Sequence, residues 1–433
     1  MRQAVSDLVS GLSDRRQGGK VDHSLHDSCL SALAMMFFQD PSMLAFQTRL
    51  QSAMHKNNLQ TLFDVNSIPK ESQMKEILDA VSPESFHPIF KEFFARVQRA
   101  KYLEQFRFID DAYLLPLDGT QYFSSERISC KHCLSKTLKN GKTIYYHQVL
   151  AATIVHPDLK QVIPLAPEPI QNGDGSEKQD CERNAGKRLV KKIRETHPKL
   201  KFIVLGDDLY ANDPFIRMVK ENNMSFIFTA KPDSHTFMFG SLDLLRYLGD
   251  GKTVVKQDEK GRKHIYKWCN NVPLNKTQSK SDYVNFLEFS IITDSKVTFK
   301  SSWVTDIPIT ADNIEKLAKA GRARWKIENE AFNTLKNQGY HAEHNFGHGS
   351  SNLSLNFFLL NLIAFFMHQI FELSDRYYKE CRKKFSSKKE FWNQLRCTIR
   401  VLVFDNWEQL LQFVTDPPVN RAPPLQKSCN KKS

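Results

Sequence analysis

The chain has 433 residues, and its hydrophobic share of 41% is sufficient for a folded core, which excludes an intrinsically disordered chain. Its 61 lysines and arginines exceed its 48 aspartates and glutamates, and the net charge of +13 suits a polyanionic partner such as nucleic acid, although a merely basic protein would show the same excess. Eight cysteines are too sparse for a secreted disulfide scaffold, so we expect a cytoplasmic protein.

Residues 1–105 are predicted to form a helical N-terminal domain. Apolar residues recur at helical spacing in LSALAMMFFQD (30–40) and MKEILDAV (74–81), and breakers such as Asp40-Pro41-Ser42 separate the helices. This domain is a candidate for DNA binding, but it carries no clear helix-turn-helix signature.

The first part of a predicted α/β core covers residues 106–230. Short links join three apolar runs into an expected antiparallel meander, and these runs lie at 113–123, 143–157 and 161–170. The strand expected in the first run ends at or near Asp118. A helix, a strand that stops at Asp207, a second helix and a buried strand follow, and this alternation implies parallel strands joined by crossovers. The predicted sheet is therefore mixed.

The remaining segments complete this plan. Short β-type runs with little helical signal predict a β-rich insertion at 231–310. The second part of the core, 311–414, contains a predicted helix over 320–340. The basic, proline-rich tail at 415–433 is expected to be disordered.

One segment, 353–373, is apolar and long enough to cross a membrane. It carries polar residues along its length, which are Asn356, Asn361, His368, Gln369 and Glu372. We therefore predict a fully buried core helix and no membrane partner.

The helix over 320–340 places a carboxylate on its apolar side. At 100° per residue, Glu328 falls within a stripe formed by Ile314, Leu317, Trp325, Phe332 and Leu335, whereas Glu330 falls on the opposite, solvent-facing side. A buried carboxylate needs a partner. Arg324, one turn earlier, offers an ordinary i,i+4 ion pair, and a metal ion is the alternative.

Three acidic residues stand at distinctive places, namely Asp118 and Asp207 at strand ends and Glu328 on the late helix. Taken alone, either aspartate is more simply a turn residue. Brought together, three carboxylates supply the hard oxygen ligands that Mg²⁺ or Mn²⁺ prefers. Two such ions can promote phosphodiester cleavage, and a basic chain would bind the DNA.

The chain resembles the DDE transposases of bacterial insertion sequences through LDGTQYFSS, VLGDDLYANDPF and RWKIENEAFNTLKNQGYHAEHNFGHG. The resemblance covers roughly 108–373 and implies an RNase H-like core. It assigns catalysis and the binding of two Mg²⁺ or Mn²⁺ ions to Asp118, Asp207 and Glu328. It also implies cleavage at transposon ends, strand transfer into double-stranded target DNA, a homodimer in the DNA complex and association with the bacterial nucleoid. The alternatives are an RNase H-like nuclease that only hydrolyses DNA, and a non-catalytic basic DNA-binding protein.

The resemblance leaves choices at individual positions. Asp208 is the alternative to Asp207, and Glu330 is the alternative to Glu328. The expected DNA contacts are Arg322, Arg324, Lys336 and His344. Related enzymes carry a tyrosine where this chain has Gly321, and their lysine follows the glutamate by seven residues, whereas Lys336 follows Glu328 by eight.

Cysteine and histidine residues form two further groups. Cys130 and Cys133, with His132, His147 and Cys181 as further donors, match the ligand types of a zinc site, but one CxxC motif favours unligated loop cysteines. His341, His344 and His348 follow the Glu328 helix. They are expected either to contact DNA and orient the helix end, or simply to belong to an ordered loop.

Overall fold

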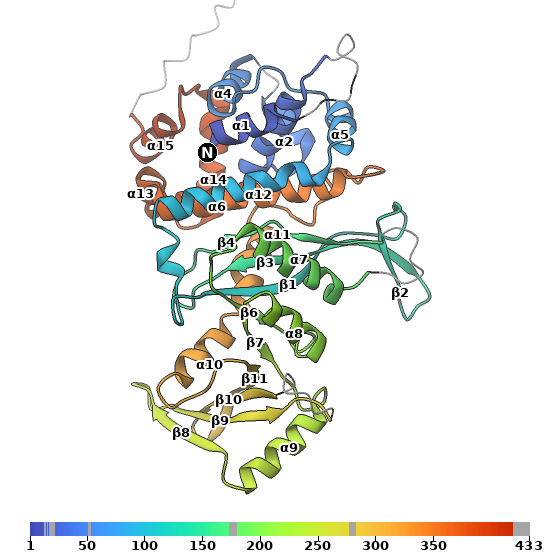
Figure 1. Cartoon of the computed structure of the whole chain (residues 1–433). Helices are drawn as coiled ribbons and strands as arrows, with labels where there is room; N and C mark the ends of the chain where they lie inside the picture. Colours follow the sequence, from blue (N-terminus) through green and yellow to red (C-terminus); the bar gives the residue numbers. More distant parts are fainter. Residues whose placement is uncertain are drawn as a thin grey trace, which may run out of the picture.

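The computed structural model describes residues 1–418 except 13, 15, 17–21, 51–52, 173–179 and 277–282. Most of the tail predicted at 415–433 therefore lies outside the described residues. Figure 1 shows three parts stacked along the molecule: a helical layer, a central sheet and a smaller part that contains β8–β11 and α9.

The central sheet is mixed, as the sequence predicts. Its strand order is β2-β3-β1-β6-β7-β11-β10-β9-β8, with β4 and β5 each paired to β3. β1 pairs with β6, and β6 with β7, in parallel, whereas β1 and β3 are antiparallel. The core strands are β1 (Tyr113–Ser125), β2 (Leu134–Thr137), β3 (Thr143–Ile154), β4 (Ile163–Pro164), β5 (Glu168–Ile170), β6 (Phe202–Gly206) and β7 (Ser225–Thr229). This arrangement confirms the predicted α/β class with an RNase H-like sheet flanked by helices.

Two crossover helices make the parallel pairing possible. α7 (Glu182–Thr196) connects β5 to β6, and α8 (Asp213–Glu221) connects β6 to β7. α8 begins where the side chain of Asn212 accepts a hydrogen bond from the backbone N–H of Phe215, with Pro214 in the first turn. Its apolar side, with Phe215, Ile216 and Val219, is buried.

The β-rich insertion contains a helix that the sequence analysis missed. α9 (Thr236–Tyr247) precedes the insertion strands, which are β8 (Lys252–Gln257), β9 (Lys263–Pro273), β10 (Tyr283–Thr293) and β11 (Lys296–Thr305). Only Met238 and Leu242 of α9 are buried, so its apolar pattern is weak. β11 pairs antiparallel with β7, and the insertion thereby extends the core sheet.

Helices from both ends of the chain form the helical layer (Figure 1). Phe37 of α2 lies at its centre and contacts the rings of Phe63, Phe371, Trp392 and Trp407. The N-terminal helices are α1 (Arg2–Ser10), α2 (Leu25–Phe37), α3 (Met43–Leu50), α4 (Ala53–Phe63), α5 (Glu71–Asp79) and α6 (His87–Arg99). The C-terminal ones are α12 (Leu353–Ser374), α13 (Arg376–Lys384), α14 (Lys388–Val401) and α15 (Trp407–Thr415).

α12 is the apolar segment that the sequence identifies as membrane-like. Among the described residues it is the only helix long and apolar enough to cross a membrane, and 89% of its most apolar window is buried within the molecule. Its polar side chains bind neighbouring elements: Asn356 donates to the carbonyls of Leu78 and Val81, and Gln369 accepts from the Val162 N–H. These internal partners are those of a core helix.

Asp79, the last residue of α5, binds the N-terminal end of α12. Its carboxylate accepts hydrogen bonds from four successive backbone N–H groups and one hydroxyl, all within the segment 350–353. Burial opposes ionisation, but these N–H donors hold the pKa of Asp79 below its usual range. The contact joins the N-terminal helices to the loop that precedes α12.

We expect Asp79→Asn to lower the free energy of unfolding by about 1–3 kcal/mol at pH 7, because charge-assisted hydrogen bonds are lost. Since the pKa of Asp79 is lowered on folding, its contribution is present above the pKa of an unfolded aspartate and is lost as the pH falls through the folded value. Urea unfolding at neutral and acidic pH measures both effects. Glu76→Gln, on an exposed position of the same helix, is the control, and equal losses in both variants would contradict the assignment.

Candidate active site

Asp118 lies within β1, not at its end as predicted. β1 continues to Ser125 because it pairs with β3 beyond the point where its parallel pairing with β6 stops. The last parallel pair joins Pro116 to Leu205. The same register, continued for two residues, sets Asp118 level with Asp207.

Asp207 directly follows β6, as expected, and the adjacent Asp208 has a different environment. One carboxylate oxygen of Asp207 accepts the N–H of Leu209 in a tight turn. Asp208 accepts the N–H of Lys231 and lies 3.3 Å from Nε2 of His235, both in the segment after β7. Geometry therefore favours Asp207 over Asp208 as the partner of Asp118.

The predicted helix over 320–340 is not continuous. α10 (Ile314–Arg322) ends before a turn at 323–324, and winding resumes as a π-helical segment (Ile327–Phe332) followed by α11 (Asn333–Asn337). The helical projection therefore placed some residues wrongly. Trp325 is 58% exposed instead of buried, and the side chain of Glu328 is 42% exposed. Glu330 is half-buried, so the predicted contrast between the two glutamates is absent.

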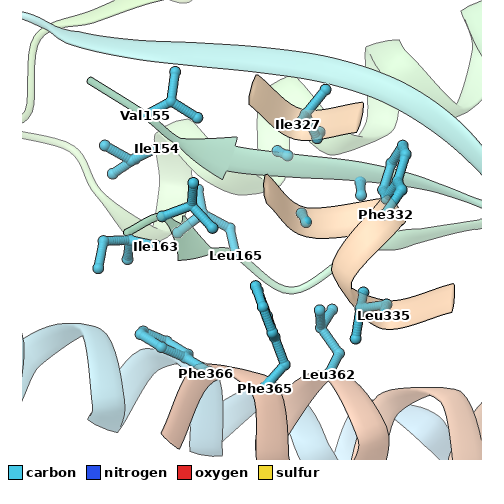
Figure 2. Packing of buried hydrophobic residues seen from close by; sticks show 14 of the residues in the cluster. Ile154, Val155, Ile163, Leu165, Ile327, Phe332, Leu335, Leu362, Phe365 and Phe366 are labelled. Carbon is cyan, nitrogen blue, oxygen red and sulfur yellow. The ribbon is translucent and has the colours of Figure 1, made fainter. Parts of the chain in front are cut away.

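Packing fixes the position of this segment. A Cβ on Gly321 would lie only 2.7 Å from the indole of buried Trp303, which explains why α10 has no aromatic side chain there. Figure 2 shows Ile327, Phe332 and Leu335 in one cluster of buried hydrophobic residues with residues of β3, β4 and α12, and Leu335 lies directly above α12. Glu328 is thus presented by a rigidly packed stretch of chain.

The π-helical winding also bears on Lys336. Hydrogen bonds from i to i+5 accommodate one residue more than an α-helical turn. Lys336 follows Glu328 by eight residues instead of the seven found in related enzymes. The π-helical turn between them accommodates this additional residue. Lys336 forms an ion pair with Glu343 at 2.8 Å.

Arg324 bridges two of the candidate carboxylates. Its Nη1 lies 2.8 Å from Oε1 of Glu328 and 3.5 Å from Oδ2 of Asp118. The i,i+4 pair expected from the sequence is present, and the same guanidinium reaches β1. The Glu328 carboxylate is also near enough to Asp118 to raise its pKa. The ion pair and the convergence of carboxylates thus occur together.

A fourth carboxylate, Glu182, was missed by the sequence analysis. It is the first residue of α7, and its Oε1 accepts a hydrogen bond from the hydroxyl of Tyr210 at 2.8 Å. A Cβ on Gly119 would lie 2.7 Å from its other oxygen, so the glycine allows this close approach to β1. No spacing motif marks Glu182, and the only signal is its position at a helix start after the meander.

Burial and neighbouring negative charge both affect the carboxylates of the site. Burial is the largest cause that raises the pKa of Asp118 to about 7; the charge of Arg324 opposes the shift, and the charges of Glu328 and Glu182 add to it. Burial likewise raises the pKa of Glu182 despite the hydrogen bond from Tyr210, and Asp207 adds to the effect. A divalent cation would relieve this repulsion.

The carboxylates approach one another without forming a closed ligand shell. Within the described part of the chain, no three carboxylates have oxygens all within 4.8 Å of one another. Arg324 links Asp118 to Glu328, and the charge of Asp207 raises the pKa of Glu182. The donor set, made only of hard oxygen atoms, fits Mg²⁺ or Mn²⁺.

The other predicted contact residues have protein partners. The Arg322 guanidinium lies over the rings of Phe289 and Phe299, and His344 packs against Phe346. Their contact with DNA stays a prediction. Cys130 and Cys133 meet His147 and His348 in a separate cluster, in which His132 and Cys181 take no part.

Comparison with protein-family models identifies the family of the chain. The family model described as transposase DDE domain matches residues 138–366, more than half of the chain. The chain belongs to the DDE transposases. The match includes Asp207 and Glu328 and begins after Asp118. Enzymes of this family process nucleic acids, and their DDE domains generally use divalent metal ions. A search of curated proteins found no significant match.

The raised pKa of Asp118 leads to a stability prediction for this transposase. Between the pKa of an unfolded aspartate, near 3.8, and about 7, the folded state binds more protons, so stability falls as the pH rises through this window. We expect Asp118→Asn to raise the melting temperature by a few degrees at pH 8 without divalent metal, and by much less at pH 5.

Thermal unfolding with EDTA or Mg²⁺ measures this difference. Mg²⁺ should stabilise the parent chain more than the variant. Asp243→Asn, at a 78% exposed side chain in the insertion, is the matched control. A parent chain that is more stable than Asp118→Asn at pH 8 in EDTA would refute the proposed repulsion.

Proposed function

We propose that this protein cleaves DNA at transposon ends and joins the freed ends to target DNA. The proposal rests on one observation: Arg324 bridges Glu328, four residues away on the same segment, and Asp118, which lies 206 residues before Arg324 in the sequence. A merely structural ion pair on a helix would not require a second carboxylate from the central sheet. The family membership and the net charge of +13 support DNA as the substrate.

Asp118, Asp207 and Glu328 would hold two Mg²⁺ or Mn²⁺ ions, and Glu182 lies close enough to Asp118 to raise its pKa. The bound ions would supply activation of the attacking oxygen and stabilisation of the leaving oxygen. Arg324 orients Asp118 and Glu328 and offsets part of their negative charge. The π segment positions Glu328 beside β1.

The proposed reaction has two phosphoryl transfers. Water attacks the phosphodiester at a transposon end, its P–O3′ bond breaks, and a 3′-hydroxyl and a 5′-phosphate result. That 3′-hydroxyl then attacks a target phosphodiester, forms a new P–O bond and displaces the target 3′-oxygen. Two ends must be handled together, so we propose a homodimer on double-stranded DNA, acting at the bacterial nucleoid. Arg322, Lys336 and His344 are the proposed DNA contacts.

The two glutamates of the π segment provide a matched test. We expect Glu328→Gln to reduce cleavage by roughly three orders of magnitude or more, because several kcal/mol of transition-state stabilisation is lost. DNA affinity should change little. Glu330→Gln, two residues away and half-buried like Glu328, should retain cleavage. The measurement is nicking of a plasmid that carries the coding gene with its native flanks, in Mg²⁺ or Mn²⁺, beside a gel-shift assay.

The products of the same reaction separate the alternatives. Joint molecules between a cleaved end and a second plasmid indicate strand transfer. Nicked or linear products without joint molecules would identify a nuclease that only hydrolyses DNA. DNA binding that is independent of Mg²⁺, with no cleavage by the parent chain, would identify a non-catalytic DNA-binding protein in which Arg324 and Glu328 form only a structural pair.

A further inference from the structure

Four sulfur and nitrogen ligands converge at a place that the proposed DNA chemistry does not use. Cys130 and Cys133 lie in the loop between β1 and β2, and His147 lies on β3. His348 comes from the loop between α11 and α12, 201 residues after His147 in the sequence. Their ligand atoms all lie within 4.8 Å of one another, and no other described group of histidine, cysteine or acidic residues meets that criterion.

The distances within this Cys₂His₂ cluster are short and nearly uniform. The two Sγ atoms are 3.8 Å apart. Nε2 of His147 lies 3.6 Å from Sγ of Cys130 and 3.5 Å from Sγ of Cys133. Nε2 of His348 lies 3.5 Å from Sγ of Cys133 and 3.1 Å from Nε2 of His147.

These separations match the edges of a zinc coordination tetrahedron. With Zn–S near 2.3 Å and Zn–N near 2.0–2.1 Å, a tetrahedral site has edges of about 3.8 Å for S···S, about 3.6 Å for S···N and about 3.3 Å for N···N. Both cysteines are free thiols, and the 3.8 Å separation of their Sγ atoms is far beyond a disulfide bond.

The surroundings are those of an ordered ligand set. Cys133 and His147 are buried, and the ring of Phe123 packs against both histidines. Nδ1 of His348 lies 2.9 Å from the carbonyl oxygen of Gly349. A hydrogen bond from Nδ1–H to that carbonyl leaves Nε2 unprotonated and directed at the cluster, as is usual for a metal-bound histidine.

We propose that Cys130, Cys133, His147 and His348 form a structural zinc site. All four ligands come from the protein, which is the composition of a closed structural site and leaves no position for a substrate. The site joins the β1–β2 loop and β3 to the loop that follows the Glu328 segment. It therefore fixes that loop only two residues before the segment 350–353, which Asp79 caps.

Metal analysis of the purified full-length protein tests the site directly. Elemental analysis should find about one zinc ion per chain after dialysis against buffer without metal. Replacement by Co²⁺ should give the ligand-field bands of a tetrahedral site and a thiolate-to-metal charge-transfer band. Neither readout requires DNA or activity, so the proposed transposase function and the zinc site can fail separately.

Matched variants assign the ligands. We expect Cys133→Ser and His348→Ala to lose zinc and the Co²⁺ spectrum, and to melt at a lower temperature. His132→Ala, in the same loop, and Cys181→Ser, at an exposed cysteine, should keep both. If the Cys133 and His348 variants do not fold, the Co²⁺ spectrum of the parent chain still decides. A folded parent chain that binds no zinc, that holds iron instead, or whose Co²⁺ complex lacks the charge-transfer band would overturn the proposal.

Discussion

The burial of Asp118 and Glu182 beside other carboxylates is the constraint that the fold has to meet at this site. Carboxylates that are close together and partly shielded from water tend to move apart or to take up protons, and burial together with the charges of Glu328 and Glu182 raises the pKa of Asp118 to about 7. Arg324 supplies only one positive charge between Asp118 and Glu328. The fold must therefore hold the carboxylates in place by packing and hydrogen bonds.

Different structural features position the four carboxylates. β1 and β6 set Asp118 and Asp207 level through their parallel register. Glu182 begins α7 and is oriented by Tyr210, which is fully buried. Glu328 lies in a π-helical segment whose Ile327 and Phe332 are buried in the core together with Leu335 of α11 (Figure 2). π-helical turns are rare and frequently occur at functional sites. The π-helical turn at Glu328 is therefore consistent with a functional role for this residue.

The sequence predicted the parts of this arrangement that follow from periodicity. Alternating strands and helices gave the mixed sheet, and Asp207 was placed correctly because an apolar run stops there. The helical projection misplaced Trp325 because it assumed one uninterrupted helix, whereas a turn and a π segment break the winding. Glu182 was missed because its approach to Asp118 depends on Gly119 and on the start of α7, which no local pattern reveals. His348 could not be joined to Cys130 and Cys133, because a contact across 215 residues is a property of the folded chain.

The loop between α11 and α12 shows how the helical layer takes part in positioning the site. Its first part is held by Tyr340, whose hydroxyl lies 2.6 Å from Nδ1 of His368 and whose carbonyl accepts a hydrogen bond from Asn361, both residues of α12. Its last part is bound by Asp79 of α5. The Glu328 segment is therefore tied at its C-terminal side to helices from both ends of the chain. The position of Glu328 relative to Asp118 therefore depends on how the helical layer packs on the sheet. The N-terminal helices contribute to the geometry of the site through this packing, independently of any contact with DNA.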